Sequence, residues 1–159
     1  MIDALSHLKE GRLADALTIC QQVLKREPEN VDAIYMTGWI ALCRKDQNAA
    51  LDRFRRVIEL QPGHARAHNN IGTILMNTGD GVAAERHFEA AIEEAPDFTE
   101  AHANLGAVRI GLGKIEAAQA ALKKAAELRP QDPDILTNLA TILMRLGDLE
   151  EAVKGFRKV

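Results

Sequence analysis

Two histidines, His64 and His68, have the residue type and the spacing that could bind a metal ion, because residues four apart lie on one side of a helix. A glycine precedes His64, and no cysteine or carboxylate completes a ligand set in the pattern. We therefore expect His68, and His102 in the equivalent position, to be packed and hydrogen-bonded side chains. No nucleophilic side chain has a general base at a catalytic spacing. These observations predict no metal, no cofactor and no enzymatic activity.

Phosphate and nucleic-acid chemistry have no better support. The segment Gly111-Leu112-Gly113-Lys114 is similar to part of a phosphate-binding loop, but it lacks the leading glycine and the serine or threonine of that motif. We interpret it as a turn between helices. The chain has 20 basic and 23 acidic side chains and a net charge of −3, which predicts no nucleic-acid partner and no membrane partner.

The cysteines and the N-terminus predict a cytoplasmic protein. Cys20 and Cys43 are scattered in apolar sequence, which is typical of reduced thiols and not of a disulfide framework. The first residues lack the basic segment and the long apolar stretch of a signal peptide. No run of 18 apolar residues is present to span a membrane.

A period of 34 residues organises the whole chain. The prolines Pro28, Pro62, Pro96 and Pro130 keep this spacing, and other columns keep the same register. Small residues recur at Gly38, Gly72, Gly106 and Ala140. A second glycine column contains Gly11, Gly79, Gly113 and Gly147, with Lys45 as the exception. Alanines recur at Ala16, Ala50, Ala84, Ala118 and Ala152, each followed four residues later by Cys20, Phe54, Phe88, Leu122 or Phe156.

Apolar residues recur at helical spacing within each unit, so each unit is predicted to be two antiparallel helices. The expected pairs are 2–9 with 14–26, 31–44 with 48–60, 65–77 with 82–94, 99–111 with 116–128, and 133–145 with 150–159. Asp80 and Asp148 are expected to cap the helices that follow them. Gly38 and its equivalents are expected to allow close helix packing, with the Ala50 column as the partner. The array divides into units 1–30, 31–64, 65–98, 99–132 and 133–159, the first short and the last incomplete.

This pattern of a small residue, alanine, phenylalanine and proline resembles the tetratricopeptide repeat, and the resemblance covers the whole chain. It implies an all-α fold, a right-handed superhelical solenoid of antiparallel helix pairs. The tryptophan column of the family contains Ile34, His68, His102 and Leu136 here, and its tyrosine column contains Ala41, Leu75, Arg109 and Leu143. Arg109 is the strangest departure, since its guanidinium must reach solvent or a partner.

Stacked helix pairs form a concave groove lined by the first helix of each pair. Helical periodicity places these residues on the groove: Tyr35, Met36, Trp39, Leu42, Asn69, Asn70, Thr73, Met76, Asn104, Ala107, Asn138 and Thr141. The asparagines Asn70, Asn104 and Asn138 could bind a peptide backbone, because an amide both donates and accepts hydrogen bonds. They could instead cap or bridge neighbouring helices. Trp39 could be a binding hot spot or could pack against the first helix pair. Acidic residues of helix 82–94, including Glu85 and Glu89, are expected on the convex side.

The function that follows is a protein-interaction scaffold that binds a peptide or a helix of another protein in this groove. The alternative is the repeat domain of a larger enzyme, such as a glycosyl- or sulfotransferase. The last helix carries the apolar residues Leu149, Ala152, Val153 and Phe156. Part of this apolar surface would pack on its own partner helix, and a further unit would cover the rest. We therefore expect either that the natural protein continues beyond Val159 or that the chain self-associates through this uncapped C-terminal end.

Overall fold

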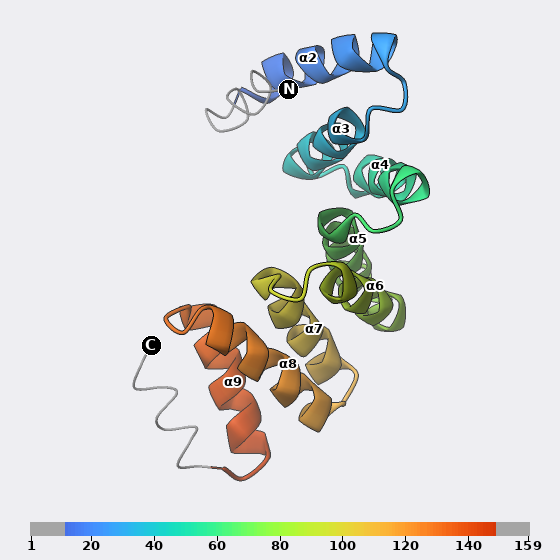
Figure 1. Ribbon diagram of the computed structural model, residues 1–159. Coiled ribbons are helices and arrows are strands. Elements are labelled where there is room, and N and C mark those ends of the chain that lie inside the picture. Colours follow the sequence, from blue (N-terminus) through green and yellow to red (C-terminus); the bar gives the residue numbers. More distant parts are fainter. Residues whose placement is uncertain (1–11, 149–159) are drawn as a thin grey trace. The chain divides into compact units, whose positions relative to one another are not determined.

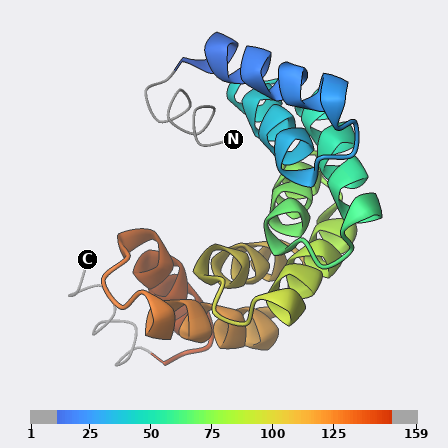
Figure 2. The same ribbon diagram turned by 45° about the horizontal axis from the view of Figure 1, so that its top comes forward.

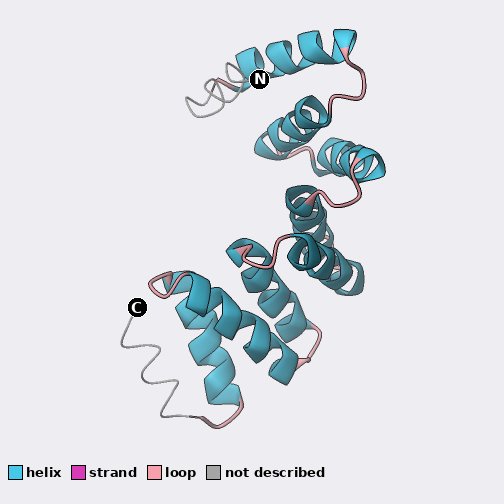
Figure 3. Cartoon of the chain, in the orientation of Figure 1, coloured by secondary structure: helices cyan, strands magenta, loops and turns pink. Residues whose placement is uncertain are grey.

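The computed structural model describes residues 12–148, and this part of the chain contains eight α-helices and no strand (Figure 3). The helices are α2 (Leu13–Arg26), α3 (Val31–Cys43), α4 (Gln47–Leu60), α5 (Ala65–Asn77), α6 (Gly81–Glu94), α7 (Thr99–Gly111), α8 (Ile115–Leu128) and α9 (Pro133–Arg145). Each predicted helix in this range agrees to within one residue at either end. The predicted helices 2–9 and 150–159, and the apolar surface expected at the C-terminal end, lie outside the described residues.

Consecutive helices pack as antiparallel pairs and make the chain an all-α helical repeat solenoid. The second helix of a pair follows the first after a short turn, and the two lie side by side, as α3 and α4 do and as α7 and α8 do (Figures 1 and 2). We call α3, α5, α7 and α9 the first helices and α2, α4, α6 and α8 the second helices. No helix of the described segment is both long enough and apolar enough to span a membrane.

Side-chain caps define where several helices begin. Asp80 precedes α6, and its carboxylate accepts the backbone N–H of Ala83 at 3.1 Å, as the sequence predicts. Asp46 caps α4 through Ala49 in the same way. A cap of this kind contributes about 1 kcal/mol to stability because it satisfies a backbone donor that has no partner within the helix. The helix expected after Asp148 lies outside the described residues.

The turn within each pair explains the second glycine column. Gly79, Gly113 and Gly147 have positive φ angles of 91°, 75° and 82°. Residues with a Cβ atom rarely adopt this region. Lys45, the exception in this column, has the same conformation with φ of 63°. The turn geometry is therefore common to the units, and the second pair carries a strained lysine where the others carry glycine.

The mid-helix glycines permit close packing, as the sequence predicts, and the side chains nearest to them are those of the bulky column four residues after each alanine. A Cβ on Gly38 would lie 2.8 Å from the ring of Phe54, and a Cβ on Gly72 would lie 2.7 Å from the ring of Phe88. The contact is thus made by the bulky column four residues after the alanine. The described members of the Ala50 column are fully buried as well, but the atoms nearest to the glycine belong to the bulky column.

By its internal contacts the chain forms two compact units, Met1–Ile71 and Gly72–Val159. The first has a core cluster of Ala16, Cys20, Met36 and Ile40, which joins α2 to α3. The second has two clusters, one around Phe88, Leu105 and Val108 and the other around Ala118, Leu122 and Ile142. These clusters pack first helices against second helices within each compact unit.

Candidate protein-interaction face

Tyr35 is the most firmly held aromatic residue on the first helices. Its ring centroid lies 4.9 Å from that of His64 and 5.5 Å from that of Phe54, and its hydroxyl accepts a hydrogen bond from the Asn70 amide at 3.1 Å. Burial raises the pKa of the Tyr35 hydroxyl, so the residue stays neutral. The half-buried Tyr35 side chain is therefore held in place, and it combines an apolar ring with a polar hydroxyl.

Trp39 lies one turn further along α3, on the same side of the helix as Tyr35. It is 38% exposed, although the buried residues of α3 around it, Gly38 and Ile40, are covered almost completely. More than a third of the Trp39 surface therefore stays in solvent and is available for a partner to cover. Together with Tyr35 it forms an aromatic pair that a partner can cover.

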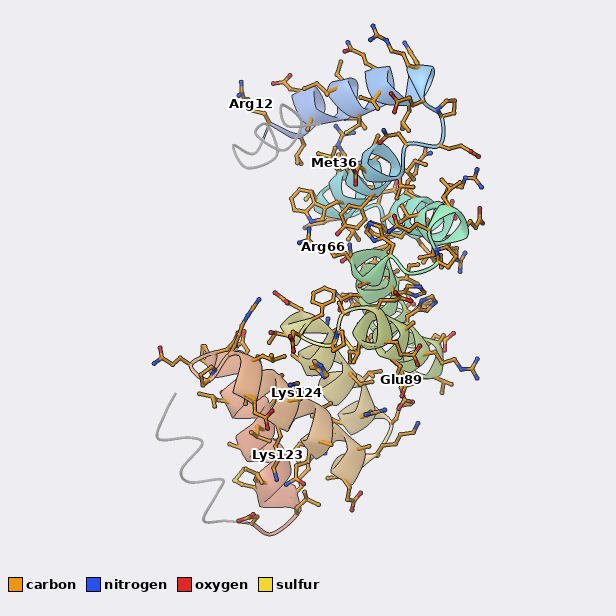
Figure 4. All side chains as sticks on the ribbon, in the orientation of Figure 1. Arg12, Met36, Arg66, Glu89, Lys123 and Lys124 are labelled. Carbon is orange, nitrogen blue, oxygen red and sulfur yellow. The ribbon has the colours of Figure 1, made fainter. Side chains whose placement is uncertain are left out.

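Two residues predicted for the groove are buried in the structure, and for them the prediction is wrong. Met36 is only 5% exposed and packs with Ala16 and Cys20, because its side of α3 lies against α2 (Figure 4). Asn69 is 9% exposed and has an interaction partner within the chain. Neither can present its side chain to a partner without a rearrangement of the core.

Two asparagines of the row, Asn70 and Asn104, bridge consecutive first helices. Asn70 of α5 donates to Tyr35 of α3, and Asn104 of α7 donates to the Thr73 hydroxyl of α5 at a long 3.5 Å. One N–H of each amide is thus turned towards the neighbouring helix. This geometry favours the bridging role that the sequence left open, and backbone binding by the row stays a prediction.

The remaining residues predicted for the groove are half-buried: Leu42, Thr73, Met76, Ala107, Asn138 and Thr141. Thr141 donates its hydroxyl hydrogen to the Thr137 carbonyl of its own helix, and Met76 packs against the Phe88 cluster. These residues belong to both compact units, and the groove that they were predicted to form together stays a prediction.

The histidines are packed and hydrogen-bonded, as the sequence predicts. Nε2 of His68 lies 2.8 Å from the Pro62 carbonyl, and Nε2 of His102 lies 2.8 Å from the Pro96 carbonyl. Since a carbonyl oxygen only accepts, this nitrogen carries the proton in both residues. At these two positions of the tryptophan column, a histidine thus joins a first helix to the proline turn before it. Within residues 12–148 no group of three or more ligand side chains could hold a metal ion.

His64 has a separate role as the cap of α5. Its Nδ1 accepts the backbone N–H of Ala67 at 3.1 Å while its ring lies against Tyr35. Burial lowers the pKa of His64, and the neighbouring Arg66 and His68 act in the same direction. The neutral ring is therefore the form that caps the helix, because a protonated Nδ1 cannot accept.

Sequence reasoning missed an ionic cluster that includes the unusual arginine. Nε of Arg109 lies 2.9 Å from the Glu85 carboxylate, its Nη2 lies 2.6 Å from that of Glu89, and Lys114 pairs with the second oxygen of Glu85. The Glu85 side chain is only 9% exposed, a burial that its expected place on the convex side did not predict. Hydrogen bonds from Lys114 and Arg109 lower the pKa of Glu85 despite its burial.

A signal for this cluster is present in the repeat columns. Glu85 occupies a column with Leu17, Leu51, Gln119 and Val153. Arg109 occupies a column with His7, Ala41, Leu75 and Leu143, and Lys114 occupies one with Arg12, Asp46, Asp80 and Asp148. Among the described second helices, α8 and α2 have no side-chain cap, since Lys114 and Arg12 stand where aspartate caps α4 and α6. Glu85, Arg109 and Lys114 are charged departures in neighbouring repeats, and their opposite charges indicate that they contact one another.

Comparisons with known proteins agree with this architecture. One family model described as tetratricopeptide repeat matches residues 41–107, 78–126 and 109–159, and a second with the same description matches residues 4–51. No curated protein matches the sequence.

Solved structures share the fold at low identity. MamA from Desulfovibrio magneticus RS-1 is 24% identical with a TM-score of 0.84, over 98% of this chain and 88% of that one. PilF from Pseudomonas aeruginosa is 20% identical with a TM-score of 0.88, over 98% and 71%. YrrB, described as a protein of this repeat class with an unusual peptide-binding site, is 19% identical with a TM-score of 0.78, over 98% and 80%.

Proposed function

The chain belongs to the tetratricopeptide repeat family, and we propose that it is a scaffold that binds a peptide or a helix of a partner protein through its first helices. The repeat architecture supports a role in protein interaction, because each helix pair leaves side chains of its first helix for a partner. The unusual peptide-binding site of YrrB is a property of that protein, and it supports the same mode of binding here.

The observation that carries the proposal is the aromatic pair on α3. Trp39 is 38% exposed beside a Tyr35 that is fixed by Asn70, His64 and Phe54. Tryptophan and tyrosine are enriched at the centres of interfaces because they bury a large area at a small cost in side-chain entropy. A rigid tyrosine also loses little further entropy when a partner covers it.

A library of random peptides displayed on phage, selected against this chain, tests the proposal. We expect Trp39→Ala to weaken the binding of the selected peptides by more than about 1 kcal/mol, measured by calorimetric titration, with little change in the free energy of unfolding. Val82→Ala is the matched control, since Val82 is 54% exposed on the second helix α6. Equal losses of binding and stability in Trp39→Ala would show a core role and contradict the proposal.

The asparagine row gives a second test. Changing Asn70, Asn104 and Asn138 together to alanine should weaken unrelated peptides alike, by about 0.5–1.5 kcal/mol for each hydrogen bond lost, if the amides bind backbone. Tyr35→Phe removes the bridge at Asn70 but leaves its amide in place. If Tyr35→Phe weakens binding as much as Asn70→Ala alone does, the residue acts by bridging helices. A cytoplasmic location stays a prediction beside this proposed function.

A further inference from the structure

A cleft of about 370 Å³ lies between α2, α3 and α4 within the first compact unit. Its apolar lining includes Leu17, Leu24, Ile40 and Ala41, and the exposed Arg44 and Arg53 also line it. Pockets that bind small ligands fall in the range of about 300–1,000 Å³. The cleft is at the small end of this range, with enough space to receive a large side chain.

The second compact unit shows what occupies the equivalent space there. Moving 68 residues along the sequence, two repeat lengths, takes Ala41 to Arg109. The same shift takes the lining residues Leu17, Gln21 and Ala49 to Glu85, Glu89 and Ala117. Arg109 hydrogen-bonds to these three residues, through Nε, Nη2 and Nη1. The arginine side chain thus fills, from within the chain, the position that remains open beside Ala41.

Ala41 is the only small residue in its column. The other members are His7, Leu75, Arg109 and Leu143. Leu75 packs against the Phe88 cluster and Leu143 is only 5% exposed, while His7 lies outside the described residues. Leu75, Arg109 and Leu143 each supply a large side chain from their own helix. The cleft exists because alanine supplies none, and its walls still have the shape that accepts one.

The charge of the cleft selects the kind of group that can enter. Around Arg109 the walls are acidic, but the equivalent walls here are Leu17 and Gln21, which carry no charge. Arg44 and Arg53 add two positive charges, and the one acidic lining residue, Asp46, is engaged as the cap of α4. An apolar group with a negative charge beside it fits this surface, and a cation does not.

We propose that this cleft binds one phenylalanine side chain of a partner protein, next to an acidic residue that pairs with Arg44 or Arg53. The site is separate from the aromatic pair. Trp39 and Ala41 are two residues apart on α3, which places their side chains about 160° apart around the helix. A partner bound at Trp39 and a phenylalanine bound in the cleft would lie on opposite sides of α3, so the outcome at one site does not decide the other.

The test uses the acetylated and amidated dipeptide of phenylalanine and glutamate, added to the isotopically labelled chain while its amide resonances are recorded. We expect saturable shifts at Leu17, Gln21, Ile40 and Ala49, with a dissociation constant on the order of millimolar for so small a ligand. The dipeptide of phenylalanine and glutamine should bind about two- to fivefold more weakly, as expected for a partly solvated ion pair. The dipeptide of alanine and glutamate should give no saturable shifts.

Two variants locate the site. Ala41→Leu, which restores the size found elsewhere in the column, should weaken the dipeptide more than tenfold and raise the thermal midpoint, because the leucine fills the cleft itself. The double variant Arg44→Gln, Arg53→Gln replaces two exposed arginines, so it should fold normally, and it should remove the preference for glutamate over glutamine. Arg129→Gln, an exposed arginine of the second unit that pairs with Glu100, is the matched control and should keep that preference. Unchanged binding in Ala41→Leu, shifts centred away from the cleft, or equal binding of the two phenylalanine dipeptides in the parent chain would each overturn the proposal.

Discussion

Arg109→Leu should destabilise the chain far more than the loss of an ordinary surface charge. The guanidinium pairs with Glu85 at 2.9 Å and with Glu89 at 2.6 Å, and its side chain is only 18% exposed. Removing it leaves a Glu85 carboxylate that is 9% exposed with Lys114 as its remaining partner. Breaking a buried ion pair on one side costs about 3–5 kcal/mol. Because Lys114 still compensates the charge, we expect a loss of about 2–3 kcal/mol.

The double variant Glu85→Leu, Arg109→Leu should recover most of that loss. Both leucines occur in the same columns of other units, as Leu17 and Leu75. Replacing a buried pair by apolar side chains of similar volume is often neutral or stabilising, since neither charge then has to be desolvated. We expect the double variant to lie within about 1 kcal/mol of the parent chain, with Lys114 reaching solvent from its half-exposed position.

Urea titration followed by circular dichroism measures both effects, because urea does not screen charges as guanidinium does. The m-value must stay constant for the comparison to hold in a repeat array. Glu89→Ala is the control, since Glu89 is 44% exposed and its pair should contribute less than about 1 kcal/mol. If Arg109→Leu costs no more than Glu89→Ala, the reasoning from burial is refuted.

The same cluster predicts a pH dependence. Lys114 and Arg109 hold the folded pKa of Glu85 below its ordinary value of 4.5. The stability from this carboxylate is therefore present above pH 4.5 and is lost as the pH falls through the folded pKa. The double variant lacks the carboxylate, so its stability relative to the parent chain should improve as the pH falls below 4.5. A difference between the two chains that stays constant with pH would contradict this assignment.

Three further changes test the turns, the packing and the helix cap. Lys45→Gly should raise the free energy of unfolding by about 0.5–1 kcal/mol, because a φ of 63° is strained for a residue with a side chain but not for glycine. Gly79→Lys should lower the free energy of unfolding by a similar amount. Gly72→Ala should cost about 1–2 kcal/mol in the same titration, since its Cβ would lie 2.7 Å from the buried Phe88 ring, whereas Gly111→Ala, with no atom within 4 Å, should be neutral or stabilising. The parent chain should lose stability as the pH falls below 6.5, because protonation of His64 removes the acceptor for the Ala67 N–H. His64→Asn should keep the cap and remove this pH dependence, which thermal melts across the same pH range would measure.

The sequence alone was sufficient for the helices, and the reason is local. Helix starts follow from caps such as Asp80, turns from residues that tolerate positive φ such as Gly79, and helix faces from apolar spacing around Ala84 and Phe88. Each signal acts within one repeat, and the 34-residue period presents it several times. The sequence could not predict the contact between the Gly38 and Phe54 columns. The alanine and the phenylalanine lie on the same face of their helix, so only packing decides which of them lies nearest to the glycine.

Which side chains of the first helices remain available was decided by tertiary structure. Met36 and Trp39 are three residues apart on α3, yet one is 5% and the other 38% exposed, because α2 packs over one side of the helix. The cluster of Glu85, Arg109 and Lys114 joins residues 24 and 29 positions apart, and its burial follows from helices that pack around it. Helical period specifies the direction of a side chain on its own helix, but exposure and charge pairing depend on what the neighbouring helices place opposite it.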